Sequence, residues 1–398
     1  MDKLESAAGA QPPRLAIVRS AYNATGGAER FVQRIAGALA LRGVDVTLIA
    51  RRWPHPAGTG LPAGVRLIEL KCFHVGRTWR DASFARAVRT AVEREAFDLV
   101  QSHERIPGLA LYRAGDGVHR EWLLQRRRKL GKLRGALDML SGTHRAVLRA
   151  EKAMFHHPAL RCVVCNSEMV RGEITRHYQV DPAKLVVIRN GVDLQRFHPA
   201  SGAERSAARV ALGCPDGKTV FLFVGSGFER KGVDLALQAL ARDAAQHQAM
   251  LVVVGRDKHQ GRYQALTQSL GIAASVQFVG PQDNVLPYYH AADALVLPTL
   301  YDPQSNAVLE AMACGLPVIT SIGCGAAELL GDGAGYVVDA LDLPGLASAM
   351  SALMNRPHAS AVGARARLAI EPYSLERMST DYLALYARLL AGAEPSDP

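Results

Sequence analysis

The sequence predicts an α/β fold with two Rossmann-like, doubly wound domains that face each other across a cleft. Short apolar runs alternate with stretches in which apolar residues recur at helical spacing, a pattern typical of parallel sheets with crossover helices. The alternation occurs in both halves of the chain. Between the halves, residues 197–203 are rich in proline and small residues and interrupt the pattern. Together these observations favour two domains built on the same plan.

The first half opens with the apolar run 14–18, which predicts a strand. A glycine turn at 25–27 follows, and apolar residues then recur at helical spacing from Ala28 to Leu39 until Gly43 ends the helix. Further strands are predicted at 44–50, 97–101, 161–165 and 185–188. We expect Ser167 to be the N-cap of the helix that follows 161–165.

The second half repeats this order, and its strands are predicted at 219–224, 251–254, 276–279, 294–297, 318–320 and 336–338. We place the domain boundary in the proline-rich break. The N-terminal domain is therefore expected at 1–198 and the C-terminal domain at 199–372. Residues 373–398 are expected to form a last helix that packs back on the N-terminal domain.

Composition excludes several classes of protein. The 398 residues are 48% hydrophobic and 21% charged, which excludes a disordered, fibrous or disulfide-scaffold protein. The net charge of +10 can attract nucleic acid, anionic lipid or a phosphate-bearing substrate. The N-terminus lacks the apolar region of a signal peptide, and no apolar run approaches the ~20 residues that cross a bilayer. We therefore expect a protein of the cytosol or of the cytosolic face of a membrane.

The pair Cys162-x-x-Cys165 permits either a zinc or redox site or a buried strand. The six cysteines are sparse, as is usual in a reducing compartment. Residues three apart on a strand face opposite sides, so the two thiols would diverge. We expect both cysteines to be core residues.

Two glycine turns are candidate anion sites. Gly26 and Gly27 stand where the first helix begins, and a helix N-terminus attracts anions, although such a turn can also be purely structural. Gly225-Ser-Gly-Phe-Glu-Arg-Lys-Gly232 matches neither the dinucleotide fingerprint nor the P-loop. Its Arg230 and Lys231 suit a diphosphate, because Arg forks to oxygens and Lys acts as a point charge. The alternative is a solvated pair of cations.

A third candidate site spans Asp302 to Glu310, after the strand predicted at 294–297. A helix expected to start near Ser305 would present free backbone N–H groups to a sugar hydroxyl or a phosphate. Asp302 could accept a hydrogen bond from the sugar, and Glu310 could hold a ribose diol. The structural alternative is a capping carboxylate and an ordinary helical glutamate.

These motifs, in this order, resemble the retaining glycosyltransferases of family 4, which have the GT-B fold. The early Gly-Gly-x-Glu-Arg, the middle Gly-x-Gly-x-x-Arg-Lys-Gly and the late acidic-x7-Glu-Ala-Met-Ala-x-Gly-x-Pro-Val blocks carry the resemblance, which covers nearly the whole chain. It is strongest to the lipopolysaccharide core glucosyltransferase I branch, to which 224–234, 253–258 and 276–279 are also similar.

The resemblance implies residue roles. Gly27, Arg230 and Lys231 would bind the donor diphosphate, with Gly26 in the same turn, and Glu310 would hold the nucleotide ribose. The donor sugar would be held by Asp302 and by the backbone around Ser305, Asn306, Ala307 and Val308. Asp116 matches an aspartate near the reacting carbon, and His103 matches an active-site histidine of some relatives. From the residues alone, a core histidine is the alternative interpretation of His103, and a turn residue is the alternative interpretation of Asp116.

Two departures from the family pattern concern the donor sugar. Asp302 stands where the family usually has glutamate, and Ser305 stands where it usually has glycine. Both lie in the expected donor-sugar pocket, so glucose is not assured as the donor sugar.

The expected chemistry needs neither metal nor cofactor. Negative charge grows on the departing diphosphate, and Arg230, Lys231 and a helix N-terminus would stabilise it. No Asp-x-Asp pair occurs in the sequence, so no metal clamp is expected.

Positive charge concentrates in residues 119–134, which hold seven Lys or Arg and one Glu. Trp122 and several leucines add an apolar component, so the segment suits an anionic membrane surface or the phosphates of a glycolipid. The expected contact residues are Trp122, Arg126, Arg127, Arg128 and Lys129. A solvated helix face is the alternative. We expect no nucleic-acid partner, because no recognised motif accompanies the segment.

The sequence therefore predicts a retaining, metal-independent glycosyltransferase. It would move a glucose-like hexose from a UDP-sugar to a lipopolysaccharide core or related glycolipid, at the inner face of the bacterial inner membrane. Two alternatives stay open: a UDP-sugar 2-epimerase of the same architecture, and a non-catalytic sugar-nucleotide-binding protein. An NAD-dependent dehydrogenase is disfavoured by the missing third glycine.

Overall fold

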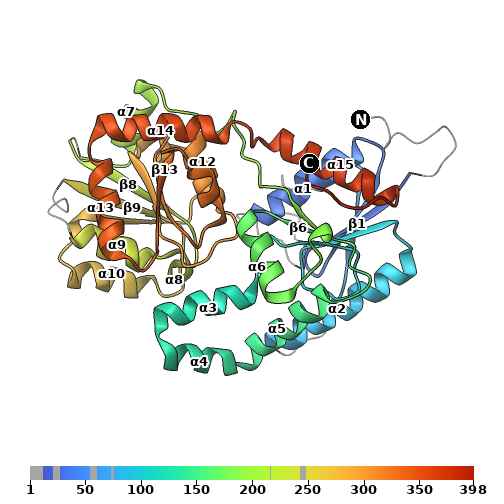
Figure 1. Cartoon of the computed structure of the whole chain (residues 1–398). Coiled ribbons are helices and arrows are strands. Elements are labelled where there is room, and N and C mark those ends of the chain that lie inside the picture. Colours follow the sequence, from blue (N-terminus) through green and yellow to red (C-terminus); the bar gives the residue numbers. More distant parts are fainter. Residues whose placement is uncertain (1–11, 21–26, 54–60, 73–75, 216, 243–247) are drawn as a thin grey trace. The chain divides into compact units, whose positions relative to one another are not determined.

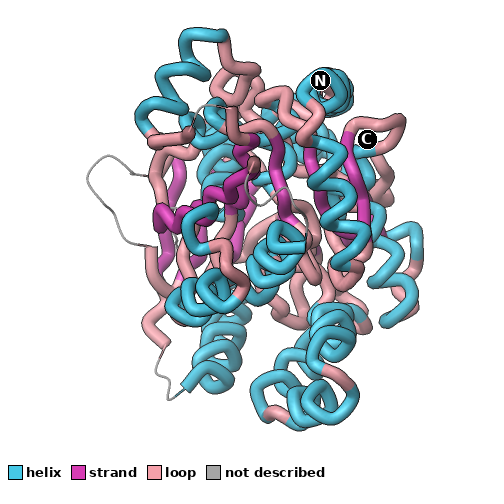
Figure 2. The backbone as a smooth tube through the Cα atoms, turned by 90° about the vertical axis from the view of Figure 1, so that its left-hand side faces the viewer, coloured by secondary structure: helices cyan, strands magenta, loops and turns pink. Residues whose placement is uncertain are grey.

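The computed structural model describes residues 12–20, 27–53, 61–72, 76–215, 217–242 and 248–398 (Figure 1). The chain divides into an N-terminal unit, residues 1–189 with 378–398, and a C-terminal unit, residues 190–377. Each unit contains one parallel sheet with helices packed around it, so both halves are Rossmann-like, as predicted (Figure 2).

The N-terminal unit has a seven-stranded sheet in the order β3-β2-β1-β4-β5-β6-β7, and every described pairing is parallel. The strands are β1 Arg14–Val18, β2 Asp45–Ala50, β3 Val65–Glu69, β4 Leu99–Ser102, β5 Leu111–Arg113, β6 Cys162–Cys165 and β7 Leu185–Val187. The helices are α1 Gly27–Ala40, α2 Gly76–Glu95, α3 His119–Leu130, α4 Lys132–Leu140, α5 Gly142–Phe155 and α6 Glu168–Tyr178.

The C-terminal unit has a six-stranded parallel sheet in the order β10-β9-β8-β11-β12-β13. The strands are β8 Thr219–Val224, β9 Ala249–Val254, β10 Val276–Gly280, β11 Ala294–Leu297, β12 Val318–Ser321 and β13 Gly335–Val338. The helices are α7 Gly202–Ala211, α8 Phe228–Lys231, α9 Val233–Arg242, α10 Gln260–Ser269, α11 Leu286–Ala291, α12 Asn306–Ala313, α13 Leu343–Leu353 and α14 Arg356–Ile370. Helix α15, Leu375–Leu390, follows.

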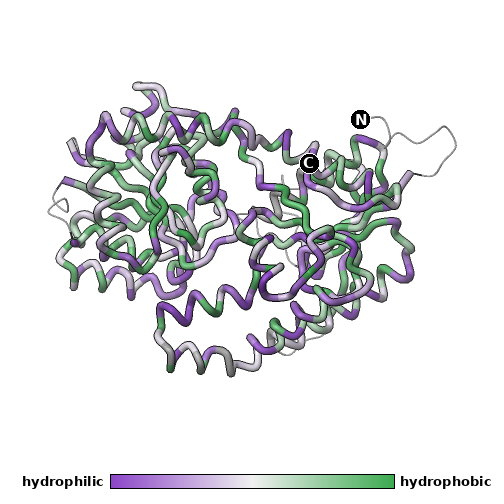
Figure 3. Tube along the Cα trace, in the orientation of Figure 1, coloured by the Kyte–Doolittle hydropathy of each residue, from purple (hydrophilic) through white to green (hydrophobic). Residues whose placement is uncertain are grey.

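Hydrophobic residues concentrate on the strands of both sheets (Figure 3). Strands β6, β9 and β11 are buried along their whole length, as expected for parallel strands covered on both faces. The predicted strands are confirmed to within two residues at each end. The predicted cap of α6 is also confirmed, because the Ser167 hydroxyl accepts a hydrogen bond from the backbone N–H of Val170 at 3.2 Å.

Both domain boundaries differ from the prediction. The first division falls between Arg189 and Asn190 and not at 198/199, because the segment after 189 is bound within the C-terminal unit. There, the N–H of Val192 donates to Tyr373 O at 3.0 Å, and the buried Phe197 ring packs edge-on to Tyr289. The second division lies inside α15, after Arg377 and not at 372/373.

From residue 378 onward, α15 belongs to the N-terminal unit. The buried Tyr382 hydroxyl accepts a hydrogen bond from Arg113 Nε at 2.9 Å, and the Tyr386 hydroxyl donates to Gln101 Oε1 at 2.8 Å. Arg161 also donates to the Leu389 carbonyl at 2.9 Å. The last helix is therefore fastened to the unit that contains the chain's first strands.

Cys162 and Cys165 are buried core residues, as expected. Both lie on β6 with free thiols, and Cys165 packs in a hydrophobic cluster with Met154, Phe155 and Tyr178. Burial raises the pKa of Cys162 to about 12, so its thiol stays protonated at neutral pH.

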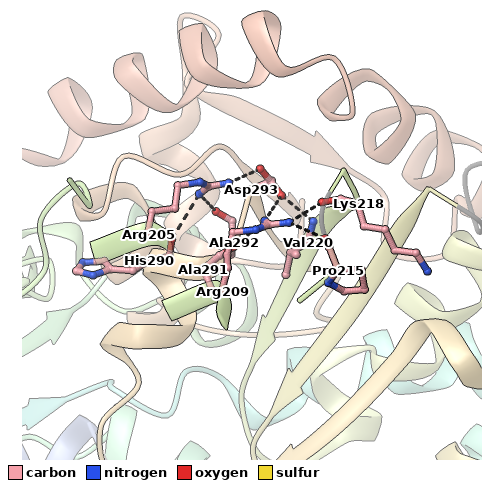
Figure 4. A network of polar contacts seen from close by, with 9 residues as sticks. All are labelled: Arg205, Arg209, Pro215, Lys218, Val220, His290, Ala291, Ala292 and Asp293. Carbon is pink, nitrogen blue, oxygen red and sulfur yellow. Dashed lines mark hydrogen bonds and ion pairs between the residues drawn. The ribbon is translucent and has the colours of Figure 1, made fainter. Parts of the chain in front are cut away.

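A charged network fixes the entry ends of β8 and β11 (Figure 4). Asp293, just before β11, accepts hydrogen bonds from Arg205 at 2.6 Å, from Arg209 at 3.3 Å and from the backbone N–H of Val220 at 2.7 Å. Both arginines lie on α7, so this helix is clamped across the amino ends of two neighbouring strands. The opposite ends of these strands carry the candidate site.

Among the described residues, no helix is both long enough and apolar enough to cross a membrane.

Candidate active site

In the C-terminal unit, the loops that follow β8 and β11 meet at the carboxyl edge of the sheet, where ligands of open α/β sheets bind. The first loop leads through α8 to Arg230 and Lys231. The Arg230 carbonyl accepts hydrogen bonds from Leu300 N at 2.8 Å and from Thr299 Oγ1 at 3.0 Å, both from the second loop. These two hydrogen bonds hold the two predicted motifs side by side.

Glycine is required at the end of α8. Gly232 has a φ of +79°, and a Cβ there would lie 2.1 Å from the Pro298 carbonyl oxygen. The missing side chain lets the chain turn into α9 directly beneath the loop after β11. The glycine that the motif places after Lys231 therefore has a steric reason.

Lys231 and Asp302 form an ion pair between the two loops, and their side chains are only 12% and 8% exposed. Burial raises the pKa of Asp302, but the opposing effects of Lys231, Arg230 and a hydrogen bond from Ser305 outweigh it and leave the pKa lowered. Asp302 is therefore ionised at neutral pH. Its backbone is fixed as well, since its N–H donates to Gly323 O at 2.8 Å.

Helix α12 begins at Asn306, close to the expected Ser305, and within the described part of the chain no side chain caps its first turn. The predicted residues Ala307 and Val308 lie in that turn, whose N–H groups point away from the helix body. Glu310 follows one turn later. Its Oε2 accepts a hydrogen bond from the buried Tyr289 hydroxyl at 2.8 Å, and that hydroxyl also lies 3.3 Å from the Ala307 carbonyl.

Tyr289 was not predicted as a site residue. Burial first, and then the charge of Glu310, raise the pKa of Tyr289 well above its usual value, so its hydroxyl keeps its proton and donates. Tyr289 lies on α11, and only the fold brings it to α12. No spacing within the sequence indicates the contact.

An amide cluster at the start of α12 was also missed. The Asn190 N–H donates to Gln304 Oε1 at 2.5 Å, and Asn190 Nδ2 donates to Asn306 Oδ1 at 3.0 Å. The sequence marks Asn190 only as the end of a predicted strand. Its role as a brace of the α12 start depends on the long-range contact.

In the N-terminal unit, His103 lies directly after β4 and is 3% exposed. The backbone N–H of His103 donates to Val18 O at 3.0 Å, and the ring Nε2 of His103 lies 3.0 Å from Gln101 Nε2. Burial first, and then the cations Arg113 and Arg19, lower the pKa of His103 well below its usual value. His103 is therefore neutral at pH 7. It is buried as a core histidine is, and it also stands at the carboxyl edge of the sheet.

Asp116 lies in the turn after β5, and its side chain is 54% exposed. Arg19, which follows β1, approaches Asp116 Oδ2 at 3.8 Å and Glu104 Oε1 at 3.4 Å. Strands β1, β4 and β5 are successive neighbours in the sheet, so Arg19, His103 and Asp116 occupy the same carboxyl edge.

Glu151 is a fully buried carboxylate that sequence reasoning missed. It pairs with Arg105 Nε at 2.9 Å and accepts hydrogen bonds from the Tyr178 hydroxyl at 2.6 Å and the His119 N–H at 2.9 Å. Arg105 also donates to the Gly117 carbonyl at 2.9 Å. This group holds the start of α3 and the turn that contains Asp116.

The basic segment forms two helices, α3 and α4, that break at Gly131, where φ is +82°. Trp122 is half-buried, and Arg126 is ion-paired with Asp138 on α4 at 3.2 Å, so Arg126 helps to hold the two helices together. Arg127 and Arg128 are exposed, and Lys129 is partly exposed. Leu133 and Leu137 on α4 are 85% and 67% exposed, which leaves apolar surface beside these cations.

The first glycine motif is described only in part. Gly26 lies outside the described residues, and Gly27 is the first residue of α1. The expected cleft between the domains stays a prediction. Within the described residues, no three or more His, Cys, Asp or Glu side chains are grouped so that they could hold a metal ion.

Comparison with known proteins gives consistent matches. The family model of glycosyl transferases group 1 matches residues 204–369, and that of glycosyltransferase family 4 matches residues 25–196. Lipopolysaccharide glucosyltransferase WaaG of Escherichia coli is 28% identical over 314 residues, which are 78% of this chain and 81% of the relative. D-inositol 3-phosphate glycosyltransferase 2 of Catenulispora acidiphila is 31% identical over 277 residues, which are 66% of this chain and 64% of the relative.

Solved structures agree with the fold. The crystal structure of WaaG matches with a TM-score of 0.81 and 26% identity, covering 95% of this chain and 100% of that one. Anabaena HepE in complex with UDP and glucose matches with a TM-score of 0.71 and 16% identity, covering 94% of this chain and 99% of that one.

Two Rossmann-like units with this order of motifs define a GT-B glycosyltransferase. The chain belongs to the family 4 glycosyltransferases, since the family 4 model and the model of glycosyl transferases group 1 together match most of its length.

Proposed function

We propose that this enzyme transfers a hexose from a UDP-sugar to a sugar hydroxyl of a lipopolysaccharide core or related glycolipid, with retention of anomeric configuration. The observation that carries the proposal is the gathering of Arg230, Lys231, Asp302 and the uncapped start of α12 at one sheet edge. Two similar proteins support it: one is a lipopolysaccharide glucosyltransferase, and the other was solved in complex with UDP and glucose.

In this proposal, Arg230 and Lys231 bind the donor diphosphate, with the Gly26–Gly27 turn on the other domain. Negative charge grows on the diphosphate as the glycosidic bond breaks, and cations fixed in advance stabilise that charge without reorganising. Lys231 is already oriented by Asp302, and the Arg230 guanidinium donates from Nη1 to the Tyr301 carbonyl at 3.4 Å. Both cations are therefore held in place before the donor arrives.

The remaining donor contacts follow from α12. Glu310 binds the ribose diol. The hydrogen bond from the Tyr289 hydroxyl fixes the position of the Glu310 carboxylate before the donor binds. Asp302 and the N–H groups of Asn306 and Ala307 hold the donor sugar, whereas the Val308 N–H already donates to the Ser305 carbonyl at 3.2 Å. The ionised carboxylate of Asp302 can accept a hydrogen bond from a sugar hydroxyl, while Lys231 balances the carboxylate's charge.

We also propose that the transfer needs no divalent metal. The support is chemical: the sequence has no Asp-x-Asp pair, and two cations already face the diphosphate site. Activity that persists in EDTA is the expected result. Loss of activity in EDTA with recovery on adding Mg²⁺ would overturn this part.

The acceptor is proposed to bind the N-terminal unit near Asp116 and His103. Departure of the diphosphate and attack by the acceptor hydroxyl occur on the same face, and a leaving phosphate oxygen takes the hydroxyl proton. Neutral His103 is suited to hydrogen bonding and not to carrying positive charge. Closure of the domains would exclude water and limit hydrolysis.

Docking to an anionic membrane surface is proposed for α3 and α4. The exposed Arg127 and Arg128 provide charge, and the exposed Leu133 and Leu137 provide apolar area one helical turn apart. Arg126 contributes by joining the helices and not as a lipid contact. The proposed location is the inner face of the bacterial inner membrane, where a glycolipid acceptor is presented.

A donor and acceptor screen read by mass spectrometry tests the function. Purified protein is incubated with UDP-glucose, UDP-galactose or UDP-N-acetylglucosamine and with truncated lipopolysaccharide core or inositol 3-phosphate. A mass gain of one hexose on the core supports the proposal, whereas a gain on inositol 3-phosphate moves the acceptor to the class of the inositol relatives. Because epimers have equal mass, UDP-sugar incubated without acceptor is read by NMR. An inverted sugar centre supports an epimerase, and binding without any turnover supports a non-catalytic protein.

A further inference from the structure

Gln304 has a buried side-chain amide of which only the oxygen has a hydrogen-bond partner among the described residues. The side chain is 5% exposed and lies on the loop between Asp302 and α12. Its Oε1 accepts the Asn190 N–H at 2.5 Å, which fixes the orientation of the amide. Its Nε2 is buried and has no hydrogen-bond partner among the described residues. A buried donor without a partner is destabilising, so natural proteins seldom keep one without a reason.

The position of this amide is set by the cluster at the start of α12. Asn190 bonds Gln304 through its backbone and Asn306 through its side chain, so the Gln304 amide lies beside the first residue of the helix. The first turn of α12 is uncapped in the described chain. The unpartnered amide donor of Gln304 therefore lies near the N–H groups that begin α12. Gln304 is also only two positions from Asp302 in the sequence.

The chemistry of the amide selects its partner. Arg230 and Lys231 already provide the charges that a diphosphate requires, and a neutral amide adds little to them. A neutral N–H donor suits a neutral oxygen, such as a hydroxyl of a sugar. Gln304 thereby differs from the backbone donors of α12, because a side chain can vary between enzymes while backbone N–H groups cannot.

We propose that Gln304 is a specificity-determining residue whose Nε2 donates a hydrogen bond to a hydroxyl of the donor sugar. The inference rests on the proposed function, since it assumes that a nucleotide sugar occupies this edge of the sheet. It goes beyond that function by assigning part of the sugar selection to one side chain. A sugar that lacks the hydroxyl, or presents it elsewhere, leaves the buried Nε2 unpaired and binds less well.

The test compares Gln304→Glu with the wild-type enzyme. Glutamate keeps an oxygen for the Asn190 N–H and nearly the same shape, but it removes the N–H donors and adds a carboxyl charge, an effect that the uncharged methionine variant separates. Gln304→Met, which removes both groups, is the second variant. Gln238→Glu is the matched control, because Gln238 lies on α9 and donates to the Asp234 carbonyl at 3.1 Å in the same unit. Calorimetry measures the affinity for UDP and for each of UDP-glucose, UDP-galactose and UDP-N-acetylglucosamine.

We expect both Gln304 variants to bind UDP like the wild type and to bind the preferred UDP-sugar about tenfold more weakly, the effect of one lost hydrogen bond. Gln238→Glu should change neither affinity. Equal weakening of UDP and UDP-sugar would show a merely structural role and overturn the inference. Unchanged UDP-sugar binding in Gln304→Glu would overturn it too, while the proposed function would stand. If wild-type protein binds neither UDP nor any UDP-sugar, the proposed function itself fails.

Discussion

The ammonium group of Lys231 and the carboxylate of Asp302 form an ion pair between two loops, and each side chain is at most 12% exposed. The loops follow β8 and β11, which are neighbours in the sheet. The pair therefore joins the two motifs that the sequence separates by 71 positions. It keeps the carboxylate ionised and sets the direction of the cation.

Replacing Lys231 by methionine should destabilise the C-terminal unit, because a buried carboxylate loses its partner. Breaking a buried ion pair from one side typically costs about 3–5 kcal/mol. The double variant Lys231→Met/Asp302→Asn should recover much of this loss, since no uncompensated charge remains. Urea unfolding of the wild type, both single variants and the double variant measures the coupling. Simple addition of the two single effects would contradict the pairing.

Replacing Tyr289 by phenylalanine should weaken nucleotide binding through Glu310. The hydroxyl that donates to Glu310 at 2.8 Å is lost while the buried ring stays. We expect about 1 kcal/mol of lost stability and a severalfold weaker affinity for both uridine and UDP, because both carry the ribose. Tyr288→Phe on the same helix is the control, and Tyr288 is less buried. Equal affinities in the two variants would remove Tyr289 from the site.

Stability should fall as the pH drops below about 6.5, and His103 should account for part of the fall. Burial, Arg113 and Arg19 depress its folded pKa, so below the unfolded value the unfolded chain binds a proton that the folded chain does not. The free energy of unfolding then decreases with falling pH by up to about 1.4 kcal/mol per unit for this group. His103→Gln should flatten the profile measured by urea unfolding between pH 7 and 5. The exposed His259→Gln should leave the slope unchanged, and an equally steep slope in His103→Gln would show that other groups cause it.

Vesicle binding should depend on α3 and α4. Arg127→Gln/Arg128→Gln removes two exposed charges and should lower cosedimentation with anionic liposomes, more so at low salt. Leu133→Ser/Leu137→Ser removes the exposed apolar area and should lower binding at every salt concentration. Arg42→Gln/Arg52→Gln alters two other exposed arginines of the same unit and is the charge-matched control. If the control pair reduces binding as much, net charge and not this surface attracts the membrane.

Local pattern predicts much of this fold. Strands β8 and β11 are found at their predicted bounds because continuous apolar runs between turns have few other interpretations. Strands β3 and β5 were missed. Strand β3 lies at the sheet edge and is only partly buried, and β5 has three residues, so neither leaves a clear apolar run.

The candidate site likewise contains residues that local sequence pattern predicts and residues that it does not. Glycines and adjacent charges predict Arg230, Lys231 and Asp302 because their motif is local. Tyr289, Glu151 and Gln304 act through partners 21, 46 and 114 positions away, and no pattern in one sequence encodes those partners. The domain boundary was misplaced for a related reason, since contacts such as Val192 with Tyr373 assign 190–198 to the C-terminal unit.

The central claim is that Arg230 and Lys231 hold the diphosphate of the donor, and calorimetry with UDP and uridine tests it most directly. In Arg230→Gln/Lys231→Gln, we predict that UDP affinity falls at least tenfold while uridine affinity stays at the wild-type value, because only UDP carries the diphosphate. Wild-type affinity for UDP in this double variant would contradict the account.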